Sequence, residues 1–194
     1  MGLLYTDSRQ GGPGNRYNPA VVSHRIRVAA LAASIAAAAW GTVSGQAQTD
    51  AKLQAELKQL FPAATSFSPK EGNPPHFTAV VNNNTAGYAW WTTELEPLER
   101  GYDGPIKMLV GMDTKGVITG VLVVEHHEPY GDFSIEPPAF GNQFKGKSIR
   151  DQFKVGVDVD AVSRATISVT SATRAIRNSA RRIARELLNP ETVR

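Results

Sequence analysis

The 194-residue chain contains no cysteine and only four histidines. The absence of cysteine excludes a disulfide framework, thiolate-bound zinc, an iron–sulfur cluster and a cysteine nucleophile. It also excludes a lipid anchor on an N-terminal cysteine, and a histidine-rich metal site is not expected from four histidines. Apolar residues nevertheless make up 41% of the chain and charged residues 20%, which is the balance of an ordinary globular protein.

An apolar run from Val28 to Trp40 follows His24, Arg25 and Arg27 near the start of the chain. Its thirteen residues are few for a membrane span, which needs about 20. A basic segment before a short apolar run is typical of a secretory signal, and the small residues before position 48 favour cleavage after Ala47. We therefore predict a leader at residues 1–47 and a periplasmic protein, with an uncleaved N-terminal membrane anchor as the alternative.

The charges that add up to the net charge of +3 are unevenly distributed along the chain. The first 47 residues contribute four arginines and one aspartate, which leaves 17 basic and 17 acidic residues in the remainder. Residues 94–136 carry nine acidic and three basic residues, whereas residues 145–194 carry eleven basic and five acidic residues. The basic C-terminal part allows nucleic-acid binding, but we expect its charges to lie on the solvated face of a helix and predict no nucleic-acid partner.

The first part of the expected mature chain is predicted to be a helix followed by a loop. Leucines and a phenylalanine recur at helical spacing between Asp50 and Phe61, and Asp50 can cap the helix. Pro62 ends it, and three further prolines within residues 62–75 predict a loop.

Two β-hairpins are predicted next. Phe77–Val81 and Gly87–Thr92 flank three asparagines, and Ile106–Met112 and Val117–Glu125 flank the tight turn Asp113-Thr114-Lys115-Gly116. Residues 126–141 contain three prolines and are predicted to form a long loop. Val155–Val159 is predicted to be a short strand.

The C-terminal part is predicted to be one long helix that begins near Ser168, with Ser168 as its N-cap. Apolar residues recur at steps of three and four from Val169 to Leu187, and Asn189-Pro190 ends the pattern. We expect an α+β fold: an antiparallel sheet built from hairpins, with helices packed on one face. Residues 48–100 and 101–188 are expected to share one domain, and 189–194 to form a tail.

The segment from Asp160 to Ser168 precedes this helix and contains Ser163 and Thr166. Free backbone N–H groups and the positive end of the helix dipole meet at a helix N-terminus, which favours a bound phosphate group. The alternative is that these hydroxyl side chains only cap the helix.

Four stretches together resemble the FMN-binding domain family. They are Gly101-Tyr102-Asp103-Gly104-Pro105-Ile106-Lys107, then Val123 to Pro129, then Gln143 to Lys147, and finally Asp160 to Ser168. The family includes the covalent-flavin subunits of the sodium-translocating NADH:quinone reductase and of the Rnf complex. The amino-acid sequence of the last stretch is most similar to that of the nitrous-oxide-reductase accessory flavoproteins, which have the domain in the periplasm.

The resemblance implies that FMN is attached to Thr166 through a phosphoester by a flavin transferase that uses FAD as donor. It makes Asp160 the motif acid, Ser163 the first hydroxyl and Ala165 the motif alanine. Ile167 and Ser168 complete the expected cofactor site. The chain departs from the family pattern at Arg164, where glycine is usual, and an arginine is strained if the turn there needs a positive φ.

His126, His127 and Glu128 follow the second hairpin. Neighbouring side chains on a strand point to opposite faces, so the two histidines do not easily share a metal ion, and we expect no metal. Hydrogen bonds from His126 and Glu128 to the flavin are one interpretation, and polar residues at the end of a strand are the other. Trp90, Trp91 and Tyr88 are expected in the core rather than against the flavin.

These expectations describe an electron-transfer flavoprotein that relays electrons between membrane-associated redox partners, a carrier more than an enzyme with its own substrate. The alternative is a sensor, or an accessory or assembly module for a periplasmic reductase, that binds flavin without a covalent bond. A secreted binding domain without a cofactor is the third possibility.

Overall fold

The computed structural model describes residues 50–189, which belong to one compact unit, Asp50–Arg194. The predicted leader and the tail beyond Asn189 lie outside the described residues. Within residues 50–189, no helix combines the length and the apolar character that a membrane crossing requires.

The centre of the fold is a five-stranded antiparallel sheet whose strands are ordered as in the chain. Both predicted hairpins are confirmed, and each central strand pairs with its sequence neighbours. The strands are β1 (Ser66–Phe67), β2 (Phe77–Val81), β3 (Asn84–Trp91), β4 (Lys107–Asp113) and β5 (Ile118–Glu125).

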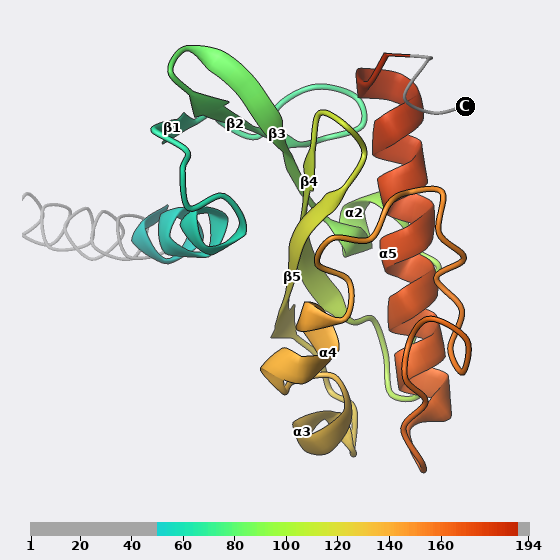
Figure 1. The fold of residues 1–194 in the computed structure, drawn as a ribbon. Coiled ribbons are helices and arrows are strands. Elements are labelled where there is room, and N and C mark those ends of the chain that lie inside the picture. Colours follow the sequence, from blue (N-terminus) through green and yellow to red (C-terminus); the bar gives the residue numbers. More distant parts are fainter. Residues whose placement is uncertain (1–49, 190–194) are drawn as a thin grey trace, which may run out of the picture. The chain divides into compact units, whose positions relative to one another are not determined.

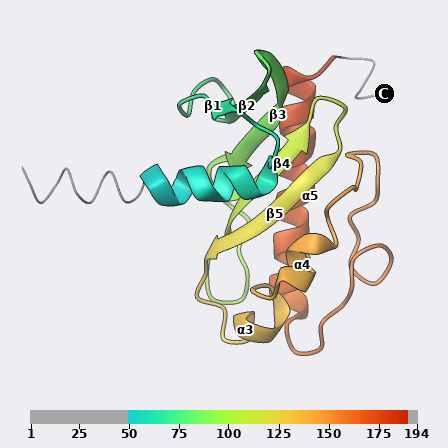
Figure 2. The same cartoon turned by 60° about the vertical axis from the view of Figure 1, so that its left-hand side comes forward.

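Helices surround this sheet (Figures 1 and 2). Residues 50–60 are helical, as predicted. The remaining helices are α2 (Thr92–Leu95), α3 (Gly131–Ser134), α4 (Pro138–Asn142) and α5 (Thr166–Leu187), so the chain has the α+β fold expected from its sequence.

The two long helical segments cover opposite faces of the sheet, not one face as the sequence pattern suggested (Figure 1). Successive side chains of a strand point to opposite faces, and β3 shows the consequence. Trp90 packs in the cluster that includes α5, whereas Trp91 packs with the helical segment 50–60. Both tryptophans are buried, as expected of core residues.

Three predicted segments differ from the structure. The predicted loop 62–75 contains β1, which pairs with β2. The predicted loop 126–141 contains α3 and α4, because a proline is tolerated in the first helical turn and α4 begins at one. The predicted strand Val155–Val159 is absent from the sheet, since its two end residues form an isolated bridge with each other across a turn.

The arginines of α5 are tied to the fold more than the solvated-face interpretation allowed. Arg181 donates to the carbonyls of Ile149 and Asp151 at 3.0 and 2.8 Å. Arg182 donates to the Leu95 carbonyl at 3.1 Å, and Arg174 bonds the carboxylate of Glu99. These arginines fasten α5 to the segments that run alongside it.

Candidate functional site

The N-terminus of α5 carries the predicted attachment residue. Thr166 is its first residue and is exposed. Ala165 occupies the cap position, where the structure shows no side-chain cap hydrogen bond, so the prediction of Ser168 as the N-cap is wrong. The first hydrogen bond of the helix runs from Val169 N to Ala165 O at 2.9 Å. The N–H groups of Thr166, Ile167 and Ser168 therefore lie before the first helical hydrogen bond and are available to an anion.

Arg164 has a φ of +69°, in the left-handed region. This is the position at which the family resemblance places glycine, and the positive φ gives a physical reason for that preference. Arginine adopts the same turn at a steric cost of roughly 1–2 kcal/mol. The backbone needed to present Thr166 is thus compatible with the residue found in this chain.

A cavity of about 340 Å³ opens beside Thr166. Its lining includes Tyr102, which is 70% exposed, and Ile167, which is 57% exposed. Tyr130 also lines it and contacts the ring of Phe133, with the ring centroids 5.5 Å apart. Large exposed apolar side chains around a cavity are typical of a ligand or partner site. The full lining is Tyr102, Pro129, Tyr130 and residues 164–168.

Glu128 joins the three segments that form this cavity. Its buried carboxylate accepts hydrogen bonds from the backbone N–H of Tyr102 at 2.9 Å and of Asp103 at 3.0 Å. It also accepts a hydrogen bond from the hydroxyl of Ser168 in the first turn of α5. A Cβ at Gly101 would lie 2.3 Å from a Glu128 oxygen, so only glycine lets the turn approach the carboxylate so closely.

The surroundings of Glu128 favour its ionised form. Burial raises the pKa of the carboxyl, but the hydrogen bonds from Ser168, Asp103 and Tyr102, with the nearby His126, outweigh burial and hold the pKa below its ordinary value of 4.5. Glu128 is therefore a fixed negative charge that orders two loops and a helix start.

His126 is a partner of Glu128 in this network. Its Nδ1 accepts from the backbone N–H of Glu128 at 3.0 Å, which leaves Nε2 to face Oε1 of Glu136 at 2.8 Å. The ring packs against Gly131, where a Cβ would lie 2.1 Å from His126 Cε1. His126 supports the loop, whereas His127 lines a different cavity.

The predicted site residues are only partly brought together. Ala165, Thr166, Ile167 and Ser168 line the cavity, and Glu128 contacts its lining. Asp160 and Ser163 are exposed and lie outside the lining. The backbone N–H of Asp160 donates to Gln143 at 2.6 Å. Sequence reasoning missed the lining roles of Tyr102, Pro129 and Tyr130; two aromatic residues beside turn residues were the available signal.

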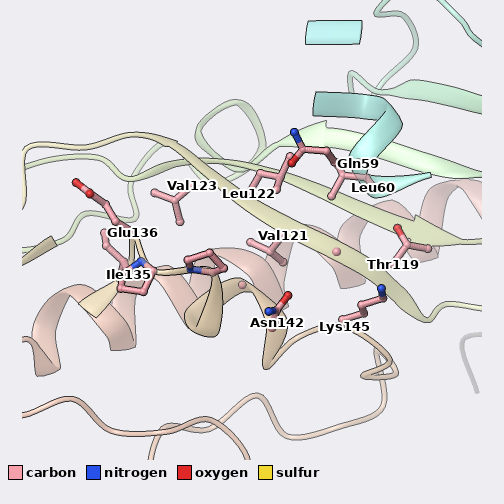
Figure 3. A pocket seen from close by; sticks show the side chains of 14 residues that line it. Gln59, Leu60, Thr119, Val121, Leu122, Val123, Ile135, Glu136, Asn142 and Lys145 are labelled. Carbon is pink, nitrogen blue, oxygen red and sulfur yellow. The ribbon is translucent and has the colours of Figure 1, made fainter. Parts of the chain in front are cut away.

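A separate cavity of about 330 Å³ lies between the helical segment 50–60, β5 and α4 (Figure 3). Gln59 and Leu60 project into it from the helix, and Val121 and Val123 from the strand. None of the residues predicted for the flavin site lines it.

Comparison with known proteins gives one family. Residues 101–181 match the family profile described as FMN-binding domain. The regulatory protein NosR of Stutzerimonas stutzeri is 29% identical over 152 residues, which cover 73% of this chain and 21% of NosR. A subunit of the ion-translocating oxidoreductase complex of Erwinia tasmaniensis is 32% identical over 118 residues, covering 55% of this chain and 54% of that protein.

The corresponding subunit of this complex in Haemophilus influenzae is 44% identical over 55 residues, 28% of this chain and 25% of that protein. This chain thus spans from about a fifth to about half of the length of these relatives. The matched residues 101–181 include the Gly101 turn, the Glu128 loop and the start of α5, which together form the cavity beside Thr166. Residues 101–181 therefore form a domain that matches the FMN-binding domain family.

Proposed function

We propose that Thr166 carries FMN through a phosphoester and that the loaded domain relays electrons between redox proteins outside the cytoplasm. The observation that carries this proposal is the place of the Thr166 hydroxyl. It is exposed, it lies at a helix start without a side-chain cap, and it borders a cavity with aromatic walls.

The helix start suits the phosphate of the cofactor. A phosphodiester keeps one negative charge, and the free N–H groups of α5 can donate to its oxygens. The helix dipole stabilises such a charge by about 0.3–1 kcal/mol at an exposed site. Arg164 lies next to the same position and adds a positive charge.

The aromatic lining suits the flavin ring. Tyr102 and Tyr130 present exposed aromatic surface to the cavity, which can pack against a planar ring. When bound, FMN supplies the capacity to accept and return electrons. Glu128 bonds both the Tyr102 loop and the first turn of α5, and these bonds fix the distance between the two sides of the cavity.

Attachment requires a separate flavin transferase with FAD as donor. The Thr166 oxygen forms a new bond to the phosphorus of the FMN half, the bond between the two FAD phosphates breaks, and AMP leaves. The hydroxyl loses its proton in the same step. Asp160 and Ser163 are exposed in front of the helix, where a transferase can reach them.

The relatives indicate the kind of partner. The matched Erwinia tasmaniensis protein is a subunit of an ion-translocating oxidoreductase complex. We infer that this chain likewise exchanges electrons with membrane-associated redox proteins, and that residues 1–47 export or anchor it on the periplasmic side.

A second candidate is an accessory module that binds FMN without a covalent bond. Its support is the match to a regulatory protein over 73% of this chain. In that case the same cavity holds the cofactor, but the Thr166 hydroxyl remains free.

The deciding experiment is the intact mass of the denatured full-length chain after co-expression with a flavin transferase. Wild type and Thr166→Ser should gain the mass of FMN minus one water, whereas Thr166→Ala should not. Ser163→Ala is the matched control and should still be loaded if the transferase needs only Thr166. A wild-type mass that equals the amino acids alone overturns covalent attachment, and colour that is lost on denaturation then favours the second candidate.

A further inference from the structure

A basic cavity of about 340 Å³ lies beside the proposed flavin site. The same two loops contribute to both cavities: Arg100 and His127 line the basic one, whereas Tyr102 and Pro129 line the one at Thr166. Glu128 lies between the two lining residues of the second loop and bonds the backbone of Tyr102 in the first. A group bound in the basic cavity therefore lies next to the proposed FMN site.

The charged residues that line the cavity are mainly basic, although those of the surrounding sequence are mainly acidic. Residues 94–136 contain nine acidic residues and only three lysines or arginines. Two of those three, Arg100 and Lys107, line the cavity, together with His127 and a single carboxylate, that of Glu125. The fold thus gathers most of the positive charge of an acidic segment at one place.

The nitrogen-bearing side chains of this cavity differ in how they are held. Lys107 Nζ lies 4.9 Å from the centroid of the Trp91 ring and 3.8 Å from Oε2 of Glu125. Within residues 50–189, by contrast, no hydrogen bond or ion pair engages the side chains of Arg100 and His127. Arg100 and His127 can therefore bind an incoming anion without breaking an existing contact, while Lys107 supplies a positioned charge.

Large exposed apolar side chains flank Arg100 in the chain. Leu98, two residues before Arg100, is 92% exposed, and Tyr102, two residues after it, is 70% exposed. Exposed apolar side chains around a charged site are typical of a surface that another protein covers. A small free anion would leave these side chains in water.

We propose that this cavity binds an aspartate or glutamate side chain of the redox protein that exchanges electrons with the domain. The identity of this partner depends on the proposed electron-transfer function. Carboxylates pair with guanidinium groups through charge-assisted hydrogen bonds. Complementary charge also brings partners together faster and in a fixed orientation.

A titration with hexaglutamate tests the site without the natural partner. In NMR spectra of the full chain, hexaglutamate should shift the backbone amides of Arg100 and His127 in a saturable way, and hexalysine should not. Arg100→Gln should weaken the apparent affinity about fivefold, the size expected for losing one exposed charge pair. Lys115→Gln, which removes the third base of the same segment at the far end of the β4–β5 hairpin, is the control and should leave the affinity unchanged.

Three outcomes overturn the proposal. The first is the lack of a saturable shift, and the second is an equal loss of affinity in the Lys115→Gln control. The third is saturation by acetate at the same carboxylate concentration, which would assign the cavity to free anions. The intact mass tests flavin loading. Titrating the chain both with and without attached FMN tests carboxylate binding in the cavity separately from that question.

Discussion

Ser168 in the first turn of α5 donates its hydroxyl hydrogen bond to the carboxylate of Glu128, forty residues earlier in the chain. That carboxylate also receives the backbone N–H groups of Tyr102 and Asp103. One buried side chain therefore sets the distance between the two walls of the proposed flavin site.

Replacing Glu128 should destabilise the domain. Glu128→Gln keeps the size of the side chain but turns one acceptor oxygen into a donor that faces a donor. We expect a loss of about 1–3 kcal/mol in the free energy of unfolding, measured by denaturant titration. Glu125→Gln, at an exposed position, should change it little. Equal effects of the two substitutions would contradict the role given to Glu128.

The same carboxylate predicts a dependence of stability on pH. Its folded-state pKa lies below the ordinary value of 4.5, so the stability that it contributes is present above that value and is lost as pH falls through the folded-state pKa. The melting temperature of wild type should therefore fall more steeply than that of Glu128→Gln below about pH 5. Asp158, whose pKa is also lowered, contributes equally to both proteins. Parallel curves would contradict the prediction.

Arg164→Gly should stabilise the turn before α5. The φ of +69° costs arginine energy that glycine does not pay, although glycine is more flexible in the unfolded chain. We expect a net gain of about 0.5–1 kcal/mol by thermal or chemical unfolding. Ser163→Gly is the control, because residue 163 has no positive φ and glycine there brings only flexibility. A gain no larger in Arg164→Gly than in the control would refute the strain.

Gly141→Ala should destabilise the protein although alanine favours helices. The change would ordinarily stabilise a helix by about 1 kcal/mol. In α4, however, the added Cβ would lie 2.4 Å from the backbone carbonyl oxygen of Val121 in β5. Overpacking of this kind costs about 1–3 kcal/mol, so the sign should reverse in a denaturation experiment. A stabilised variant would show that α4 is free to move away from β5.

Arg181→Gln tests whether the arginines of α5 are structural. Arg181 donates to two carbonyls of the 149–151 segment, and its loss should cost about 1–3 kcal/mol of unfolding free energy. Arg185→Gln, at an exposed position on the same helix, should be near neutral. If both variants unfold like wild type, the basic face is only solvated.

Local pattern was sufficient to predict the elements that are long and regular. The Asp113 to Gly116 turn sits between two β-like runs, and β4 and β5 form there. The apolar stripe of α5 predicted its core face, since Val169, Ile176 and Ile183 are all buried. In each case the regular spacing of apolar residues predicts the element, because these residues are the ones that become buried in the core.

The missed features depend on contacts between distant residues. Ser168 has the residue type of an N-cap, but its hydroxyl is engaged by Glu128, and the helix already begins at Thr166 with Ala165 in the cap position. Tyr102 and Tyr130 lie near turns, and their shared cavity with Thr166 arises only when Glu128 joins their loops. A pattern within one segment carries no information on such tertiary contacts.

The split of the neighbouring tryptophans between the two sheet faces gives the domain a pair of built-in optical reporters. Trp90 senses the layer formed with α5, and Trp91 senses the layer formed with the helical segment 50–60. Emission from variants that lack Trp40 and retain either Trp90 or Trp91 would show whether the two layers melt together or in sequence.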